Sequence, residues 1–361
     1  MDARQECVLH VAGEVATETF DGTVHALAQI GLHQILLPLK PAASRRAPQV
    51  LEVRWLQWPS ALLARIRALE DELAALSGER ALYAVHLHGA AACLLGARAL
   101  RGAATKTRLL FSPQLGELSP WKSLLVGRLL KAKLAPLHDG MVVASPGEAY
   151  AVSRLLERSA EVLPPAADGV FFQVQRQDGG RPAVLAGGSA ADAVESVSRL
   201  AVLLNGREER VPIAWLGSVS RAARAQLDAA GVRVLDGEDD AGRARLFAIA
   251  SAYLHLSPGN RELRALAQAM AAGVPCLACD TLAHRAILRH GETGFICVGP
   301  LDFLEKLIML LREAPERERV GQAARAEAAR AFTQRHFETA VLRAYGFHRV
   351  TVLPRKSVNV A

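Results

Sequence analysis

The sequence has no uninterrupted apolar run of transmembrane length and no basic-then-apolar leader, since it begins MDARQEC. We therefore expect no membrane-spanning helix and a cytoplasmic location. Cysteine is scarce, and its five residues are odd in number and scattered, so a disulfide framework is not expected. Cys276 and Cys279 have no second Cys/His pair at ligand spacing, so no metal site is expected either.

The length and the net charge of the chain indicate its domain number and the kind of partner it suits. Its 361 residues, 51% of them hydrophobic, are enough for two domains, each with a core of its own. Lysine and arginine exceed aspartate and glutamate by 43 − 36 = 7. This balance suits an anionic partner such as a nucleotide, a phosphate-bearing lipid or an anionic membrane surface, and charge alone does not choose among them. A nucleic-acid partner is not expected.

The stretch from Leu254 to Thr281 carries the clearest local signal. A short apolar strand precedes helix breakers, and a helix with apolar residues at three-four spacing follows. Gly273, followed by Pro275, predicts the end of this helix. Because such a helix start lies over the carboxyl edge of a sheet, the pattern predicts a phosphate site. The residues expected there are Pro258, Gly259, Asn260 and Arg261.

Two motifs in and after this stretch resemble a known family. QAMAAGVP, from Gln268 to Pro275, and HGETGF, from His290 to Phe295, are similar to the donor-site helix and glycine turn of family 4 glycosyltransferases. Members of that family are retaining enzymes of the GT-B fold. The resemblance implies a helix with Glu-x7-Glu, whose carboxylates contact the donor sugar and the ribose. Asn260 and Gln268 occupy those two positions, so both carboxylates are absent.

The diphosphate-binding positions also depart from the family. There, a strand ending in Gly-Arg and a lysine five residues later neutralise the donor diphosphate. Gly188 and Ala193 stand at these positions. Arg264, on the same helix as Gln268, could reach a phosphate, although arginines at a helix start are most often solvated. The resemblance therefore implies a donor site made of Gly187, Gly188, Pro258, Gly259, Asn260, Arg261, Arg264 and Gln268.

The first half resembles the acceptor side of the family. Gly22 remains of a glycine pair that opens the acceptor-side cleft, and AVHLHG is close to the family's Val-His-x-His-Gly. His86 and His88 of this segment either border the cleft or pack with a hydrogen bond to a neighbouring loop, and both readings have equal weight. Gln114 replaces the family histidine beside the donor sugar. Glutamine still forms hydrogen bonds but carries no proton or charge near neutral pH.

A basic segment follows, SPWKSLLVGRLLKAKL, with leucines on one side. One interpretation is a helix that lies on an anionic membrane surface, and the other is an ordinary amphipathic helix with solvated lysines. The residues that would contact the membrane are Trp121, Lys122, Arg128, Lys131 and Lys133.

Strands and helices alternate along the whole chain, which predicts an α/β fold. The resemblance implies GT-B, with two Rossmann-like domains facing each other across a cleft. We expect an acceptor-side domain at 1–165, a nucleotide-sugar domain at 166–331, and at 332–361 a helix that crosses back to the first domain, followed by a tail.

Two functions of different class follow from these observations. In the first, the chain is a glycosyltransferase-like protein of glycan or polysaccharide assembly whose transfer is weak or absent, and which binds a glycan, a nucleotide or a partner glycosyltransferase. In the second, it is an active glycosyltransferase with an altered donor site and a lipid-linked or polysaccharide acceptor. No cofactor is expected, and the donor of an active enzyme would be a UDP- or GDP-sugar. A cytoplasmic protein of either kind would also suit the inner face of the membrane.

Overall fold

The structure is a computed structural model in which the chain divides into two compact units. The first unit comprises Met1–Leu163 and Phe337–Ala361, and the second comprises Pro164–His336. The residues that the structure describes are 6–13, 18–40, 51–100, 107–115, 120–134, 140–177, 182–188, 191–206, 211–257 and 263–347.

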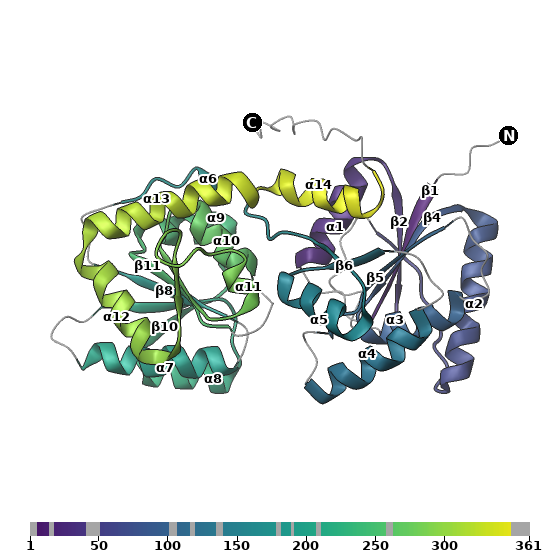
Figure 1. Ribbon diagram of the computed structural model, residues 1–361, viewed down its shortest axis with the longest axis horizontal. Coiled ribbons are helices and arrows are strands. Elements are labelled where there is room, and N and C mark those ends of the chain that lie inside the picture. Colours follow the sequence, from purple (N-terminus) through teal and green to yellow (C-terminus); the bar gives the residue numbers. More distant parts are fainter. Residues whose placement is uncertain are drawn as a thin grey trace. The chain divides into compact units, whose positions relative to one another are not determined.

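The first unit is built on a seven-stranded parallel sheet in the order β3-β2-β1-β4-β5-β6-β7 (Figure 1). The order reverses between β1 and β4, and open α/β sheets generally bind ligands at the carboxyl ends of the strands beside such a reversal. The strands are β1 (Glu6–Ala12), β2 (His33–Pro38), β3 (Glu52–Val53), β4 (Ala81–His88), β5 (Arg108–Ser112), β6 (Gly140–Val143) and β7 (Glu161–Val162).

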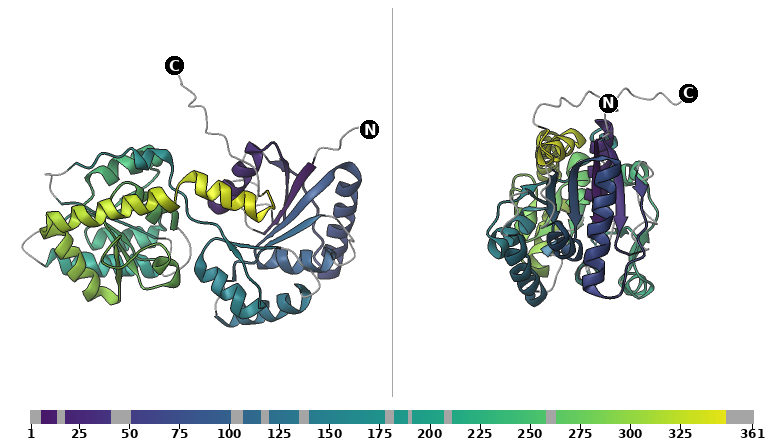
Figure 2. Two further views of the ribbon diagram at one scale, coloured as in Figure 1. Left: turned by 45° about the horizontal axis from the view of Figure 1, so that its top comes forward. Right: turned by 90° about the vertical axis from the view of Figure 1, so that its right-hand side faces the viewer.

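Helices cover both faces of this sheet. Alternate β1 residues such as Leu9 pack in one apolar cluster with α2 to α5, whereas Ala12 packs with Phe20 and Val24 of α1 on the opposite face. Two views place the yellow helix α14 beside the purple helix α1 (Figure 1, Figure 2). The helices are α1 (Glu18–Gln29), α2 (Leu62–Glu79), α3 (Ala90–Ala99), α4 (Pro120–Leu134), α5 (Pro146–Leu156) and α14 (Gln334–Ala344).

The second unit repeats this plan with a six-stranded parallel sheet in the order β10-β9-β8-β11-β12-β13. Here the order reverses between β8 and β11. The strands are β8 (Val184–Gly187), β9 (Ile213–Leu216), β10 (Val232–Leu235), β11 (Ala252–His255), β12 (Cys276–Cys279) and β13 (Phe295–Cys297). The helices are α6 (Gly169–Phe172), α7 (Ala191–Asn205), α8 (Arg221–Ala229), α9 (Asp240–Ile249), α10 (Leu263–Ala271), α11 (Leu282–Arg285), α12 (Gly299–Arg312) and α13 (Ala314–Ala331).

The central strands of both units are short apolar runs because helices cover them on both faces. In the second unit, Tyr253 and Cys276 pack toward α9, α10 and α13, while Trp215 and Leu254 pack toward α7 and α12. The predicted α/β fold with two Rossmann-like units is thus confirmed. No helix within the described ranges combines the length and the apolar character needed to span a bilayer.

Candidate functional site

Helix α10 of the second unit ends as the sequence predicts. Gly273 has φ +74° and its N–H donates to the carbonyl of Met270 at 2.9 Å, so the left-handed glycine terminates the helix. The helix presents Gln268 in a completely buried position. Neither its amide oxygen nor its amide nitrogen has a hydrogen-bond partner in the described part of the chain. Such a side chain is costly to bury unless a water or a ligand completes its hydrogen bonds.

Gly187 and Gly188 lie at the carboxyl end of β8, next to the reversal in strand order. A Cβ atom on Gly187 would lie 2.6 Å from the Tyr253 hydroxyl, so this glycine is needed for packing. Gly188 has φ +152°, and a Cβ atom there would lie 3.0 Å from the Cβ of Ala193. Ala193 itself is completely buried in an apolar cluster. Arginine at 188 would therefore be strained, and lysine at 193 would have to enter the core.

Arg264 is engaged inside the second unit. Its Nη2 forms an ion pair with Asp168 and lies 3.4 Å from Oδ2 of Asp240. Two carboxylates thus offset its charge, which weakens its electrostatic attraction for a phosphate. The other residues expected at this helix start, Pro258, Gly259, Asn260 and Arg261, lie outside the described residues.

Two buried histidines accompany these donor-side residues. His255 ends β11 and His284 lies in α11, and their ring centroids are 5.0 Å apart. His284 Nδ1 donates to the carbonyl of Cys279 at 2.8 Å. The Nε2 atoms of both rings have no hydrogen-bond partner among the described residues. Burial lowers the pKa of His255 to about 3 and also lowers that of His284, so both rings are neutral near pH 7.

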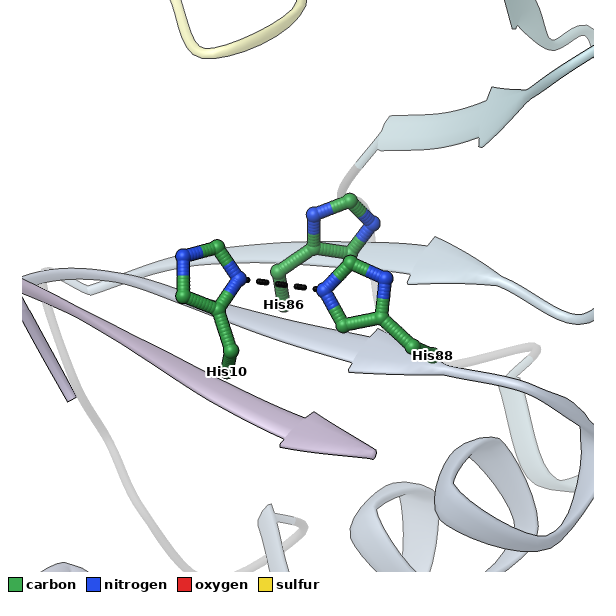
Figure 3. Close-up of side chains that lie close together, drawn as sticks. All are labelled: His10, His86 and His88. Atoms are coloured by element: carbon green, nitrogen blue, oxygen red, sulfur yellow. Dashed lines mark hydrogen bonds between the residues drawn. The ribbon is translucent and has the colours of Figure 1, made fainter. Parts of the chain in front are cut away.

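Three further histidines, which are far apart in the sequence, converge in the first unit. His10 of β1 is opposite His86 of β4, and His88 lies two residues further along the same face. Nδ1 of His10 lies 3.0 Å from Nε2 of His88 (Figure 3). Burial lowers the pKa of His10 to about 4, and burial together with the neighbouring histidines lowers the pKa of His86 and His88 well below the usual value.

The hydrogen bonds around His10 determine which of its nitrogens carries the proton. Gln34 Nε2 donates to the carbonyl of Val24 at 2.8 Å, so Gln34 Oε1 is the atom that faces His10. This oxygen accepts from His10 Nε2 at 3.1 Å. Neutral His10 therefore has its lone pair on Nδ1, and His88 Nε2 donates to it.

The same reasoning applies to His86. The hydroxyl of Ser112 donates to the carbonyl of Val142 at 2.6 Å, so it accepts from His86 Nε2 at 2.8 Å. His86 Nδ1 then accepts from the hydroxyl of Tyr345 at 2.6 Å. Tyr345 directly follows α14, so this network joins the C-terminal segment to the sheet. Both His86 and His88, near the end of β4, are buried.

Gln114 and Gly22, the two other residues assigned to the acceptor side, have clear structural settings. Gln114 follows β5 and has φ +52°, a left-handed conformation that costs a residue other than glycine roughly 1–2 kcal/mol. Such strain clusters at functional sites. Gly22 lies inside α1 and not in a turn. A Cβ atom at Gly22 would lie 2.7 Å from Phe337, so the absence of a side chain at Gly22 allows the C-terminal helix to pack closely against α1.

The basic segment forms α4, and its leucines differ in exposure. Leu130 is buried, whereas Leu124, Leu125 and Leu129 are 45% to 52% exposed. Lys122, Arg128 and Lys131 are exposed on the same helix. Lys131 forms an ion pair with Glu157, which is itself exposed. The side chain of Trp121 is not among those described.

Two comparisons show which known proteins this chain resembles. Residues 223–327, within the second unit, match the family model of glycosyl transferases group 1. The whole chain has the fold of the GT-B glycosyltransferases, with two Rossmann-like units. The resemblance to family 4 glycosyltransferases is thus confirmed.

Particular relatives give the extent of this likeness. A phosphatidyl-myo-inositol mannosyltransferase of Mycobacterium leprae is 35% identical over 117 residues, and the match spans 32% of this chain and 31% of that protein. Sucrose-phosphate synthase from Thermosynechococcus elongatus has a TM-score of 0.74 at 14% identity, covering 95% of this chain and 98% of that one. HepE of Anabaena, solved with UDP-glucose, has a TM-score of 0.71 at 13% identity, covering 94% and 98%. At such identity the solved structures establish the fold alone.

Proposed function

We propose that this chain is a glycosyltransferase-like protein of glycan or polysaccharide assembly that binds a nucleotide sugar weakly and transfers sugar slowly or not at all. The observation that carries this proposal is the setting of Arg264. The one described cation of the predicted donor site is held by Asp168 and Asp240 of its own unit. A diphosphate would have to compete with two carboxylates for it.

The missing charges explain why transfer would be slow. A nucleotide-sugar donor leaves as a diphosphate, so the transition state needs positive charge or dipoles on the leaving oxygens. Removing one such group typically costs about 10²- to 10³-fold in rate. At the positions where the family has arginine and lysine, this chain has a glycine at φ +152° and a buried alanine. Reintroducing the charged pair would therefore cost stability before it improved binding.

Gln268 supports retained binding of the nucleoside. Among the described residues its buried amide has no partner for either the acceptor oxygen or the donor nitrogen, and a ribose diol can both donate to the oxygen and accept from the nitrogen. A uridine or guanosine nucleotide is the class of ligand that fits, in keeping with the UDP-glucose bound to HepE. The amide cannot neutralise charge, so it contributes to binding more than to catalysis.

Calorimetric titration of the full chain with UDP and GDP tests the donor site. We expect dissociation constants above roughly 0.1 mM, corresponding to binding free energies weaker than about −5.5 kcal/mol. Gln268→Ala should abolish the remaining binding, while Arg199→Ala, on the exposed surface of α7, is a matched control that should not. Micromolar binding, or robust transfer that Gln268→Ala removes, would instead establish the alternative, an active glycosyltransferase with an altered donor site.

For the acceptor side we propose the carboxyl edge of the first sheet, with Gln114 and His88 nearest the ligand. The left-handed backbone of Gln114 supports this assignment, because strain of this kind is maintained where function requires it. Gly22 and His86 would support the site indirectly, through Phe337 and Tyr345 of the C-terminal segment. A lipid-linked or polysaccharide acceptor is the class implied by the family resemblance, and a partner glycosyltransferase would supply the catalysis that this chain lacks.

We also propose that α4 binds an anionic membrane surface at the inner face of the cell membrane. The combination of exposed Leu124, Leu125 and Leu129 with Lys122 and Arg128 supports this role. Binding to vesicles that contain phosphatidylserine should weaken with salt, since screened attraction acts over about 8–10 Å at ordinary ionic strength. Lys122→Glu with Arg128→Glu should abolish it. Equal binding to neutral vesicles, or by this variant, would disprove the proposal.

A further inference from the structure

Three histidine side chains of the first unit lie on one face of its sheet, where the strand order reverses. His10 comes from β1, and His86 and His88 come from β4 (Figure 3). One ring nitrogen of each lies within 4.8 Å of the other two, and all three residues are buried. We propose that His10, His86 and His88 form a binding site for a divalent transition-metal ion of the zinc type. This proposal does not depend on the proposed sugar-transfer function.

The surroundings of His10 prepare it as a ligand. Its Nε2–H is held by Gln34, whose own amide is oriented by the carbonyl of Val24. The lone pair on Nδ1 is therefore directed into the cluster. Histidine ligands of metal sites generally donate their other ring N–H to an oxygen in this way, which fixes the tautomer and the ring orientation.

His88 can become a ligand by a change of tautomer alone. Its Nε2 lies 3.0 Å from His10 Nδ1 and donates a proton to it in the metal-free protein. Moving that proton to His88 Nδ1 frees a second lone pair at Nε2, and the ring remains neutral. A tetrahedral zinc ion at about 2.0 Å from each nitrogen needs a separation of about 3.3 Å, so these two nitrogens are already close to the required spacing.

His86 supplies the third lone pair through Nδ1. Ser112 holds its Nε2–H, as Gln34 holds that of His10. An ion at Nδ1 takes the place of the hydrogen bond from Tyr345, whose hydroxyl is 2.6 Å away. The displaced hydroxyl oxygen or a water would then occupy the fourth position. Metal binding and the position of the C-terminal segment are therefore linked.

The ligand set selects the class of ion. Neutral imidazole nitrogens suit Zn²⁺, Co²⁺, Ni²⁺ and Cu²⁺, whereas Mg²⁺ and Ca²⁺ prefer oxygen ligands. The cluster contains three imidazoles and no carboxylate. Because the side chains come from β1 and β4, a bound ion would join the two strands at the reversal point.

The test uses the full chain purified without chelator. Metal analysis by mass spectrometry should find close to one zinc ion per chain, and the metal-stripped protein should bind Co²⁺ with the visible absorption of a tetrahedral nitrogen site. Zn²⁺ at about a hundredfold excess over the dissociation constant should raise the melting temperature of the first unit by roughly 5–10 °C. Mg²⁺ at the same concentration should give no shift.

Variants identify the ligands. His10→Gln and His88→Gln should each weaken Co²⁺ binding at least about tenfold, whereas His284→Gln, which changes a buried histidine of the second unit, is the matched control and should leave it unchanged. The Co²⁺ spectrum of the unaltered protein does not depend on whether a variant folds. Absence of both zinc and the Co²⁺ absorption would overturn the proposal, and so would Co²⁺ binding that both histidine variants retain.

Discussion

The two units share one strand order, but they satisfy their buried polar groups in different ways. In the first unit, both ring nitrogens of His10 and of His86 have partners, which include Gln34, Ser112 and Tyr345. In the second unit, the Nε2 atoms of His255 and His284 and both amide atoms of Gln268 have none within the described residues. The same topology thus carries one polar cluster whose hydrogen bonds are formed within the chain and another whose hydrogen bonds are incomplete among the described residues.

This difference follows from where the partners come from. The first unit recruits Tyr345 from the end of the chain, whose hydroxyl reaches His86 and whose carbonyl accepts from Tyr83 at 2.6 Å. In the second unit, no described residue from a distant segment bonds His255, His284 or Gln268 in this way. Their open hydrogen bonds suit a water or a ligand. We infer that the contacts of Tyr345 contribute to the stability of the first unit, and that the open hydrogen bonds of the second cluster contribute mainly to binding.

The largest loss of stability should come from removing the C-terminal segment that carries Tyr345. Ending the chain at His336 would delete Phe337, Val341, Leu342 and Tyr345, all buried. At about 1.5–3 kcal/mol for each side chain, the loss is comparable to the whole stability of a domain. We expect the first unit to lose its cooperative unfolding transition in calorimetry while the second unit keeps its own.

A chain that ends after Phe347 is the matched control for this truncation. It retains α14 and the stacking of Phe347 on Tyr83, with ring centroids 4.8 Å apart. Its first unit should unfold as in the full chain. If the chain that ends at His336 keeps both unfolding transitions unchanged, the C-terminal helix is dispensable and the comparison between the units is wrong.

The next largest effect is a loss of stability of the second unit at acidic pH. The pKa of His255 is lowered to about 3 in the folded chain, so below pH 6.5 the unfolded state binds a proton that the folded state does not. Stability is therefore present above pH 6.5 and is lost as the pH falls toward 3. At pH 5 the loss should be about 2 kcal/mol for His255, and His284 adds to it.

Denaturant unfolding of the second unit between pH 7.5 and 5 measures this dependence. His255→Asn removes the titrating group and should reduce the slope of stability against pH. Because slopes are compared, the cost of the substitution at neutral pH cancels. A slope that is the same in both proteins would mean that His255 is not held neutral by burial.

A smaller effect is expected at the contact between α1 and α14. In Gly22→Ala the new methyl group would meet Phe337 at 2.7 Å, an overpacking that typically costs about 1–3 kcal/mol. Phe337→Leu in the same chain should restore part of the loss by making room. Melting of the two variants checks this, and additive losses would show that the two residues do not share a contact.

Local features were well predicted from the sequence. The period of α10, its end at Gly273 and the alternation of elements all depend on neighbours within a few residues, and they are confirmed. The histidine cluster was not foreseen because His10 and His88 are 78 residues apart, and only the pairing of β1 with β4 brings them together. Tyr345, which lies 259 residues from His86, was likewise unforeseeable.

The candidate donor site depends on contacts between distant residues, which the sequence does not give. The sequence left Arg264 either to reach a phosphate or to be solvated, and its ion pairs with Asp168, 96 residues away, and with Asp240 depend on long-range packing. The positions of Gly188 and Ala193 were read from the family motif. The closeness of Gly188 to Ser257 and the burial of Ala193 in an apolar cluster depend on packing between distant residues, which no local pattern encodes.

The smallest effect on stability, and the sharpest test of the comparison, is expected at Gln268. Gln268→Met keeps the length of the side chain but removes two polar atoms that have no partner in the described part of the chain. Replacing an unsatisfied buried group by an apolar one of similar shape is nearly neutral or stabilising, so the change should lie within about 1 kcal/mol. The same variant should lose the weak binding of UDP in calorimetry. A destabilisation of several kcal/mol would mean instead that Gln268 is satisfied inside the folded protein, and the two units would then not differ in the way that their hydrogen bonds indicate.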